Sequence, residues 1–313
     1  MLDDKSQVQE PQGVDALHLG GCREESSSGD VSEAAEGRPI QSLLPLEVDG
    51  RAMPPSQRGA VSDAMHFGRP RKTIQDLLLR EGMVAVRLAV GLDSAEVLQD
   101  TLARQLGQNS QETRARYAQS ILRWFFPDGV NGLATRVWAA YQDVAVETDF
   151  LRYLYLSSEP VMGACVSEAL FPLEEGMQIP ADYFDRFLRG HFGGDSPAKT
   201  RKRLKSNLMH LGFLARAKGK PDRLCSVAST KTAFLILVHH LFAPTGVRTV
   251  EVSRLLSNPF WKYLGYKSED TVRQVLREAD AAGLLGKYVV ADQLEQVTTC
   301  MTLDEMLARK VRL

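Results

Sequence analysis

The chain has 313 residues, a formal net charge of −1 and 44% hydrophobic residues. This length is sufficient for two or three domains with hydrophobic cores, and the net charge alone gives no sign of a charged partner. The four cysteines lie far apart with no Cys-x-x-Cys pair. We therefore expect neither a zinc site nor a disulfide framework, and we expect a cytoplasmic location.

The charge is unevenly distributed along the chain. Residues 1–68 contain five Lys/Arg and twelve Asp/Glu, a net charge of −7, which leaves +6 for residues 69–313. The acidic stretch is rich in Ser, Gly, Glu and Pro and has no sustained apolar period, so it cannot bury enough surface to offset its ordering entropy. We predict a disordered acidic tail over 1–68. One hypothesis is that this tail competes with an anionic partner for basic residues elsewhere in the chain.

Helical patterns dominate after the tail. The segment "SQETRARYAQSILRWFF" places Tyr117, Ile121 and Phe125 on one helix face at spacing four, with Ser110 as the N-cap. Similar segments joined by short breaks predict a helical bundle domain over residues 69–157. A secondary set of candidate contacts for a polyanion lies on this helix and consists of Arg114, Arg116 and Arg123. Ordinary surface charge is the simpler interpretation of that set.

The next stretch has the order helix, helix, helix, hairpin. In "SPAKTRKRLKSNLMHLGFLAR", Leu204, Leu208 and Leu211 fall at i, i+4 and i+7, and Gly212 stands where a glycine ends a helix. The following "FLARAKGKPDRLCSV" predicts a strand, a Gly/Pro turn and a second strand. This succession is typical of a winged helix, which we predict over residues 158–228.

The same succession recurs about 70 residues later in the chain. The third helices and the following strands align without gaps in five pairs: Thr200 with Thr271, Leu204 with Val275, Leu208 with Ala279, Gly212 with Gly283, and Leu214 with Leu285. The sequence therefore predicts a mainly α protein, in which a helical bundle is followed by two tandem winged-helix modules. The second module covers residues 229–313.

The two predicted modules differ in charge. Residues 197–223 contain nine Lys/Arg against one Asp, whereas residues 268–296 contain three Lys/Arg against six Asp/Glu. If the basic residues only kept a surface solvated, nothing would require one copy to hold them all. The acidic second module would repel phosphate, so docking of partner proteins or dimerisation is the role we expect there.

Helical geometry separates the basic residues of the first module into groups. At 100° per residue, Lys199 and Lys202 point away from the leucine stripe, Arg203 and Lys205 flank that outward face, and Arg201 lies nearer the apolar edge. In a winged helix the third helix enters the major groove, so we predict binding of double-stranded DNA through the helix 197–211 and the hairpin. The candidate contacts are Lys199, Arg201, Lys202, Arg203, Lys205, Arg216, Lys218, Lys220 and Arg223. The alternative is a solvated basic helix face.

No residue pattern indicates catalysis, a metal or a cofactor. His239 and His240 lie in the apolar stretch "TAFLILVHHLFAPTGV", where a satisfied core histidine is the simpler interpretation than a metal ligand. This stretch is too short to span a bilayer. The glycines of "FGGDSP" lack the Lys-Ser/Thr ending of a P-loop, and Asp195 or Ser196 before Pro197 is better interpreted as a helix cap. We therefore predict that the chain is not an enzyme and does not contact a membrane.

The order of parts resembles the BrxA-type proteins of BREX bacteriophage-defence systems. The likeness covers residues 73–290 and is carried by "NSQETRARYAQSILRWFF", "LRYLYLSSEPVMGACVSEAL", "IPADYFDRFL" and "TRKRLKSNLMHLGFL". It implies a small, helical, cytoplasmic and non-catalytic protein that binds DNA. It also implies partners from the same multi-protein system, which we expect at the acidic second module.

Two other functions stay open at this point. Tandem winged helices also occur in accessory subunits of condensin-like complexes, which implies an adaptor or scaffold with no direct DNA role. A transcriptional regulator is the other alternative. The aromatic stretch "SNPFWKYLGYKS" is expected to pack in a core, although an aromatic loop can also anchor a partner. A homodimer is one of the assemblies that the sequence allows.

Overall fold

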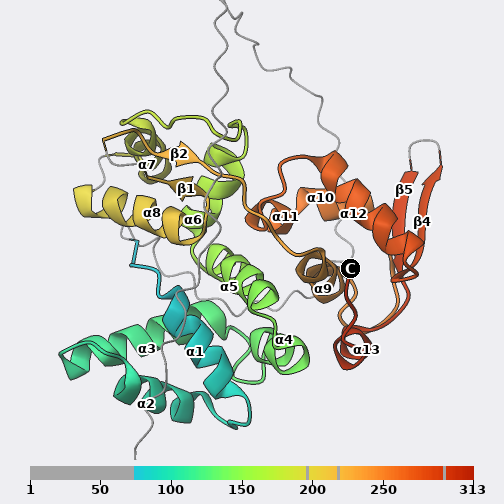
Figure 1. Ribbon diagram of the computed structural model, residues 1–313, viewed down its shortest axis with the longest axis horizontal. Helices are drawn as coiled ribbons and strands as arrows, with labels where there is room; N and C mark the ends of the chain where they lie inside the picture. The colour runs from blue at the N-terminus through green and yellow to red at the C-terminus, as the bar shows by residue number, and fades with distance from the viewer. Residues whose placement is uncertain (1–73, 195–196, 217–218, 292–293) are drawn as a thin grey trace, which may run out of the picture. The chain divides into compact units, whose positions relative to one another are not determined.

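The computed structural model describes residues 74–194, 197–216, 219–291 and 294–313. The predicted acidic tail over 1–68 and its competition with DNA lie outside these residues, as do Lys218 and the predicted cap at Asp195 or Ser196. The described part is mainly helical with two small antiparallel sheets, which confirms the mainly α prediction (Figure 1). None of its helices is long and apolar enough to cross a membrane.

Five helices form the first part of the described chain. In order they are α1 (Leu79–Ala89), α2 (Ala95–Gln105), α3 (Gln111–Phe125), α4 (Leu133–Tyr141) and α5 (Val144–Ser158). Ser110 caps α3 as predicted, because its Oγ accepts a hydrogen bond from the Thr113 N–H at 3.0 Å. Ile121 and Phe125 are buried and Tyr117 is half-buried against the same core, which confirms the predicted apolar face of α3.

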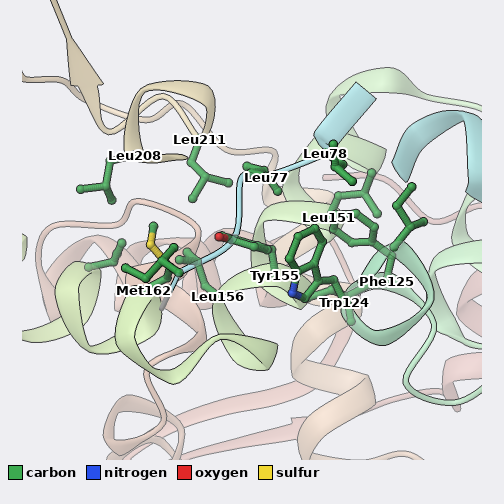
Figure 2. Packing of buried hydrophobic residues seen from close by; sticks show 14 of the residues in the cluster. Leu77, Leu78, Trp124, Phe125, Leu151, Tyr155, Leu156, Met162, Leu208 and Leu211 are labelled. Atoms are coloured by element: carbon green, nitrogen blue, oxygen red, sulfur yellow. The ribbon is translucent and has the colours of Figure 1, made fainter. Parts of the chain in front are cut away.

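The core of these helices continues into the next part of the chain. Trp124 is fully buried and lies edge to face with Tyr155, with 5.2 Å between ring centroids (Figure 2). Leu208 and Leu211 of the basic helix belong to the same cluster of buried side chains, and so does Leu77 at the start of the described chain. The predicted bundle and the first predicted module therefore share one hydrophobic core.

The second part follows the expected order of helices and hairpin. Its elements are α6 (Pro160–Ala164), the π-helix η1 (Cys165–Leu170), α7 (Tyr183–Phe192), α8 (Ala198–His210), β1 (Leu214–Ala215) and β2 (Arg223–Leu224). β1 and β2 pair antiparallel, with Leu214 opposite Leu224. An isolated bridge joins Gln178 to Arg223, so the segment before α7 also lies along the hairpin.

The third part contains a larger hairpin. Its elements are α9 (Lys231–Phe242), β3 (Thr249–Glu251), α10 (Val252–Ser257), α11 (Phe260–Tyr263), α12 (Glu269–Ala281), β4 (Leu285–Ala291), β5 (Leu294–Thr299) and α13 (Leu303–Ala308). The sheet has the strand order β3-β5-β4 and is antiparallel. Figure 1 labels β4 and β5, which form its hairpin. β3 lies between α9 and α10, so it adds a strand to the predicted succession of three helices and a hairpin.

α8 and α12 have the same length and the same geometry at their C-terminal ends. Thr200 and Thr271 each occupy the third position of their helix, so the gapless alignment keeps its register in the structure. Gly212 and Gly283 follow the helices with φ angles of 84° and 69°. In both helices the N–H after the glycine donates to the carbonyl five residues earlier, at 2.9 Å. This left-handed turn favours glycine, because a Cβ would be strained there.

A buried polar network on α5 fixes the junction between the second and third parts. Asp149 and Arg152 pair at 2.8 Å, and their side chains are 3% and 8% exposed. Asp149 also accepts hydrogen bonds from the Thr230 N–H at 2.7 Å and from the Ser229 hydroxyl at 3.1 Å. Arg152 donates through Nε to the carbonyl of Leu211 at 3.1 Å. α5 thereby holds both the end of α8 and the start of α9.

The aromatic stretch "SNPFWKYLGYKS" packs within the chain, as its simpler interpretation predicted. Phe260 and Trp261 are buried, and Trp261 lies edge to face with Phe171, with 5.3 Å between centroids. The Lys267 Nζ donates to the carbonyl of Leu170 at 3.1 Å, where η1 ends. These contacts join the third part to the second.

Candidate nucleic-acid interface

The outward face of α8 carries the two lysines that helical geometry places there. Lys199 and Lys202 are exposed, whereas Leu204 and Leu208 are fully buried. Within the described residues neither lysine has an ion-pair partner. Both ammonium groups therefore face solvent as unneutralised charges.

Two arginines of α8 are engaged with neighbouring elements. Arg201 is half-buried and pairs with Asp185 of α7. The Nε of Arg203 lies 3.2 Å from the carboxylate of Asp76, and its Nη1 donates to the carbonyl of Ile74 at 3.1 Å. Arg203, which was predicted to flank the outward face, is thus half-buried and ion-paired.

The segment that precedes α1 is held on α8 by a buried amide that the sequence analysis missed. The Oδ1 of Asn207 accepts from the Leu77 N–H at 3.0 Å. Its Nδ2 donates to the carbonyl of Gln75 and to the hydroxyl of Tyr155, both at 2.7 Å. Asn207 lies next to Leu208 on the buried face, and an amide at such a position could have indicated a backbone partner.

A single carboxylate joins α8 to the hairpin. Asp222 precedes β2, and its side chain is 6% exposed. It accepts hydrogen bonds from Lys205 of α8 and from the Nε of Arg216, the latter at 3.1 Å. Burial by itself would raise the pKa of Asp222, but the bonds from Lys205 and Arg216 outweigh it and hold the pKa below its ordinary value. Lys205, which was also predicted to flank the outward face, is therefore half-buried and ion-paired.

These side chains surround an open hollow of about 790 Å³ beside α8. Asp76 is the acidic residue of its lining, and its basic residues are Lys199, Arg201, Lys202, Arg203, Lys205 and Arg216. A second hollow of about 500 Å³ shares Lys205 and Arg216 and is also lined by Lys220 and Asp222. A concave surface with this excess of cations attracts a polyanion.

Two further predicted contacts lie at the hairpin. Lys220 and Arg223 are exposed, and Arg223 is the first residue of β2. The hairpin therefore adds cations to those of α8. The remaining predicted contact of the hairpin, Lys218, is outside the described residues.

The secondary set on α3 has mainly structural partners. Arg114 donates to two backbone carbonyls around the end of α2, at 2.7 and 2.9 Å. Arg123 pairs with Glu159 at 2.5 Å. Arg116 is exposed, with its guanidinium carbon 5.8 Å from the ring centroid of Tyr117. None of the three lines the hollow beside α8 as it is described.

The matching helix α12 has its charge neutralised from several sides. Arg273 aligns with Lys202, but it pairs with Glu269 at 3.1 Å, Asp270 at 3.3 Å and Glu295 at 2.9 Å. The hydrogen bond to Glu295 is the main reason why the pKa of Arg273 rises above its ordinary value. At the position where α8 presents Lys202 to solvent, α12 thus has an arginine that is neutralised by carboxylates of α12 and β5.

The histidine pair of α9 contributes no metal centre to the described structure. His239 is fully buried, its Nδ1 lies 2.9 Å from the carbonyl oxygen of Leu235, and burial lowers its pKa. This confirms the predicted core position, but the hydrogen bonding of His239 is satisfied at Nδ1 only, because its buried Nε2 has no partner among the described residues. Over the described ranges, no group of three or more His, Cys, Asp or Glu side chains could hold a metal ion.

Comparisons with known proteins overturn the resemblance to BrxA-type proteins. No family model matches the chain, and no curated protein matches it. Among solved structures, the "SspB crystal structure" is similar, with a TM-score of 0.48 and 14% sequence identity over 75% of this chain and 84% of that one. The assignment to BREX systems is therefore wrong. Neither a function nor a partner is transferred from SspB, because at this identity and score the likeness carries none.

Proposed function

We propose that this chain is a non-catalytic protein that binds duplex DNA through α8 and the hairpin β1–β2. We further propose that residues 158–228 and 229–313 are two winged-helix modules, of which the first contacts DNA. The observation that carries the proposal is the hollow beside α8, whose described lining has six basic residues and one acidic residue. When the cations of such a surface neutralise phosphates of a duplex, counterions bound to the DNA are released, and this release is the main source of non-specific affinity.

The exposed cations form two groups, one on α8 and one on the hairpin, as expected for a protein that contacts both the groove and the backbone of a duplex. Lys199 and Lys202 lie near the start of α8, where a recognition helix enters the major groove. Arg216, Lys220 and Arg223 lie on the hairpin and reach phosphates beside the groove. If these five residues each contact one phosphate, the logarithm of affinity falls against that of salt concentration with a slope of about −4 to −5.

Fluorescence anisotropy of the full chain with a labelled duplex, at several salt concentrations, tests this proposal. The double variant Lys199→Glu/Lys202→Glu should lose about a hundredfold in affinity at low salt, and its salt slope should be shallower by about two. The matched control is Arg277→Glu/Lys287→Glu, which makes the same charge change at exposed positions of the second module. No binding by the parent chain at low salt, or equal losses in both variants, would overturn the proposed site.

A second candidate function follows from the exposed edge of the larger sheet. The strand order leaves β4 at an edge, where its backbone groups can pair with a further strand. Val290 and Leu294, near the end of this hairpin, are 64% and 47% exposed. We propose that this edge binds a protein, either a partner or a second copy of the chain. Light scattering after size exclusion tests it: a salt-insensitive dimer without DNA affinity would favour an adaptor over a DNA-binding protein.

A further inference from the structure

Asp222 contacts two cations that come from different elements of the proposed DNA site. Lys205 belongs to α8, and Arg216 directly follows β1. The backbone carbonyl of Asp222 accepts from the Ile179 N–H at 2.8 Å, so the residue is also fixed to the segment before α7. A carboxylate inside a surface for phosphate repels the ligand, and its net effect depends on what it does to the cations beside it.

Both cations are held in place and yet reach the surface. The side chain of Lys205 is 24% exposed and that of Arg216 is 59% exposed, and both line the two hollows. Arg216 uses its Nε for Asp222. Within the described structure its two terminal amino groups have no hydrogen-bond partner, and they suit the oxygens of a phosphate. Asp222 thus orders two long side chains that would otherwise sample many rotamers.

The ordering of a side chain before binding has a predictable effect on affinity. Fixing one long, flexible side chain on association lowers affinity about two- to tenfold, and a residue that fixes it beforehand removes this loss. The loss that Asp222 prevents applies to two side chains, whereas the repulsion that it causes comes from one charge. The charge is also shared between Lys205 and Arg216, which weakens its effect on a ligand.

We propose that Asp222 is a positioning residue, which holds Lys205 and Arg216 together so that both contact one backbone phosphate of the duplex. The proposal rests on the proposed function, since it concerns the same surface. It predicts that removal of a negative charge from this surface weakens DNA binding. Charge alone predicts that the same change strengthens DNA binding, so the measured direction of the change in affinity distinguishes the two explanations.

The test is the duplex affinity of the full-length Asp222→Asn variant, measured by anisotropy beside the parent chain. We expect about a five- to tenfold loss of affinity. The matched control is Asp182→Asn on an exposed pair of the same module, which changes the charge equally and should leave affinity unchanged or slightly higher. If Asp222→Asn folds and binds as tightly as the parent or tighter, the proposal is wrong.

A second variant keeps the test independent of folding at Asp222. Arg216→Lys keeps the positive charge but loses the planar group that binds Asp222 and phosphate together, so affinity should fall about fivefold. Its control is Arg189→Lys, at an exposed position of α7. Unchanged affinity of Arg216→Lys would overturn the positioning role. If the parent chain itself does not bind DNA, the proposed function is wrong. If the parent binds DNA and the variants bind it equally well, only the role of Asp222 is refuted.

Discussion

The helices α8 and α12 are built alike and charged differently. Both span thirteen residues, both end in a left-handed glycine, and both are followed by an antiparallel hairpin. On α8, Lys199 and Lys202 face solvent without an ion-pair partner among the described residues. On α12, Arg273 is paired with three carboxylates.

This difference shows which features of a repeat belong to the fold and which are open to function. Buried positions and helix ends must satisfy packing and backbone geometry in both copies. Exposed positions contribute little to stability, so their charges can diverge. The surplus of cations on one copy is therefore a property of the surface and not of the shared skeleton.

The largest expected effect concerns a buried pair at matching positions, Leu208 and Ala279. Leu208→Ala gives α8 the side chain that α12 has, and it should lower the free energy of unfolding by about 2–5 kcal/mol because a cavity remains. Ala279→Leu should cost about 1–3 kcal/mol through overpacking. Urea denaturation of each full-length variant measures both. A cost below about 1 kcal/mol for Leu208→Ala would contradict the described packing.

The two helix ends should respond equally to substitution. Gly212→Ala and Gly283→Ala each place a Cβ on a left-handed residue, which costs about 1–2 kcal/mol. A Cβ at Gly212 would meet its nearest neighbour at 3.9 Å, and one at Gly283 would meet nothing within 4 Å, so steric clashes should not separate the two costs. The same denaturation experiment checks this expectation. A clear difference between the variants would mean that the two ends are not equivalent.

The stability of the chain should depend on pH because of two histidines in its third part. Burial lowers the pKa of His239 and of His240 below the ordinary value of 6.5, so the unfolded chain takes up these protons first as pH falls. Their contribution to stability is complete above about pH 6.5 and is lost progressively below it, by about 1 kcal/mol per histidine over one pH unit. Denaturation at pH 7.5 and 5.5 measures the loss, which should shrink in His239→Gln. An unchanged loss would exclude His239 as a source.

The smallest expected effect concerns the acidic residues 1–68. Their removal changes the formal net charge from −1 to +6. A more positive chain attracts DNA more strongly, so the fragment 69–313 should bind a duplex about two- to threefold more tightly at low salt. Anisotropy at low and high salt measures this difference, which should vanish at high salt. Equal affinity of the two chains at low salt would dismiss competition by the acidic residues.

Local patterns in the sequence predicted the parts of the structure that depend on neighbouring residues. The apolar stripe with Leu204 and Leu208, the cap at Ser110 and the glycine at position 212 each follow from helical periodicity or terminal geometry. The alignment of α8 with α12 was also predicted correctly, because it depends on the same local patterns. These features need no knowledge of which distant segments meet.

The pairing of charges could not be predicted in this way. Arg203 contacts Asp76, which is 127 positions earlier in the chain, and a helical wheel contains no information on such contacts. Lys205 and Asp222 are closer in sequence, but their contact depends on how the hairpin folds back on α8. The short strand β3 was also missed, because it forms only through pairing with β5.

The network around Asp149 and Arg152 has a consequence for cooperativity. The Nη1 of Arg152 also donates to the Ser229 hydroxyl at 3.1 Å. If Ser229 and Thr230 moved away from α5, Asp149 and Arg152 would therefore lose hydrogen bonds in a place with little access to water, which is costly. Partial unfolding of the third part alone is therefore unfavourable, and the described chain should melt in a single transition. By thermodynamic linkage, a duplex bound at α8 would then also stabilise the surroundings of Trp261.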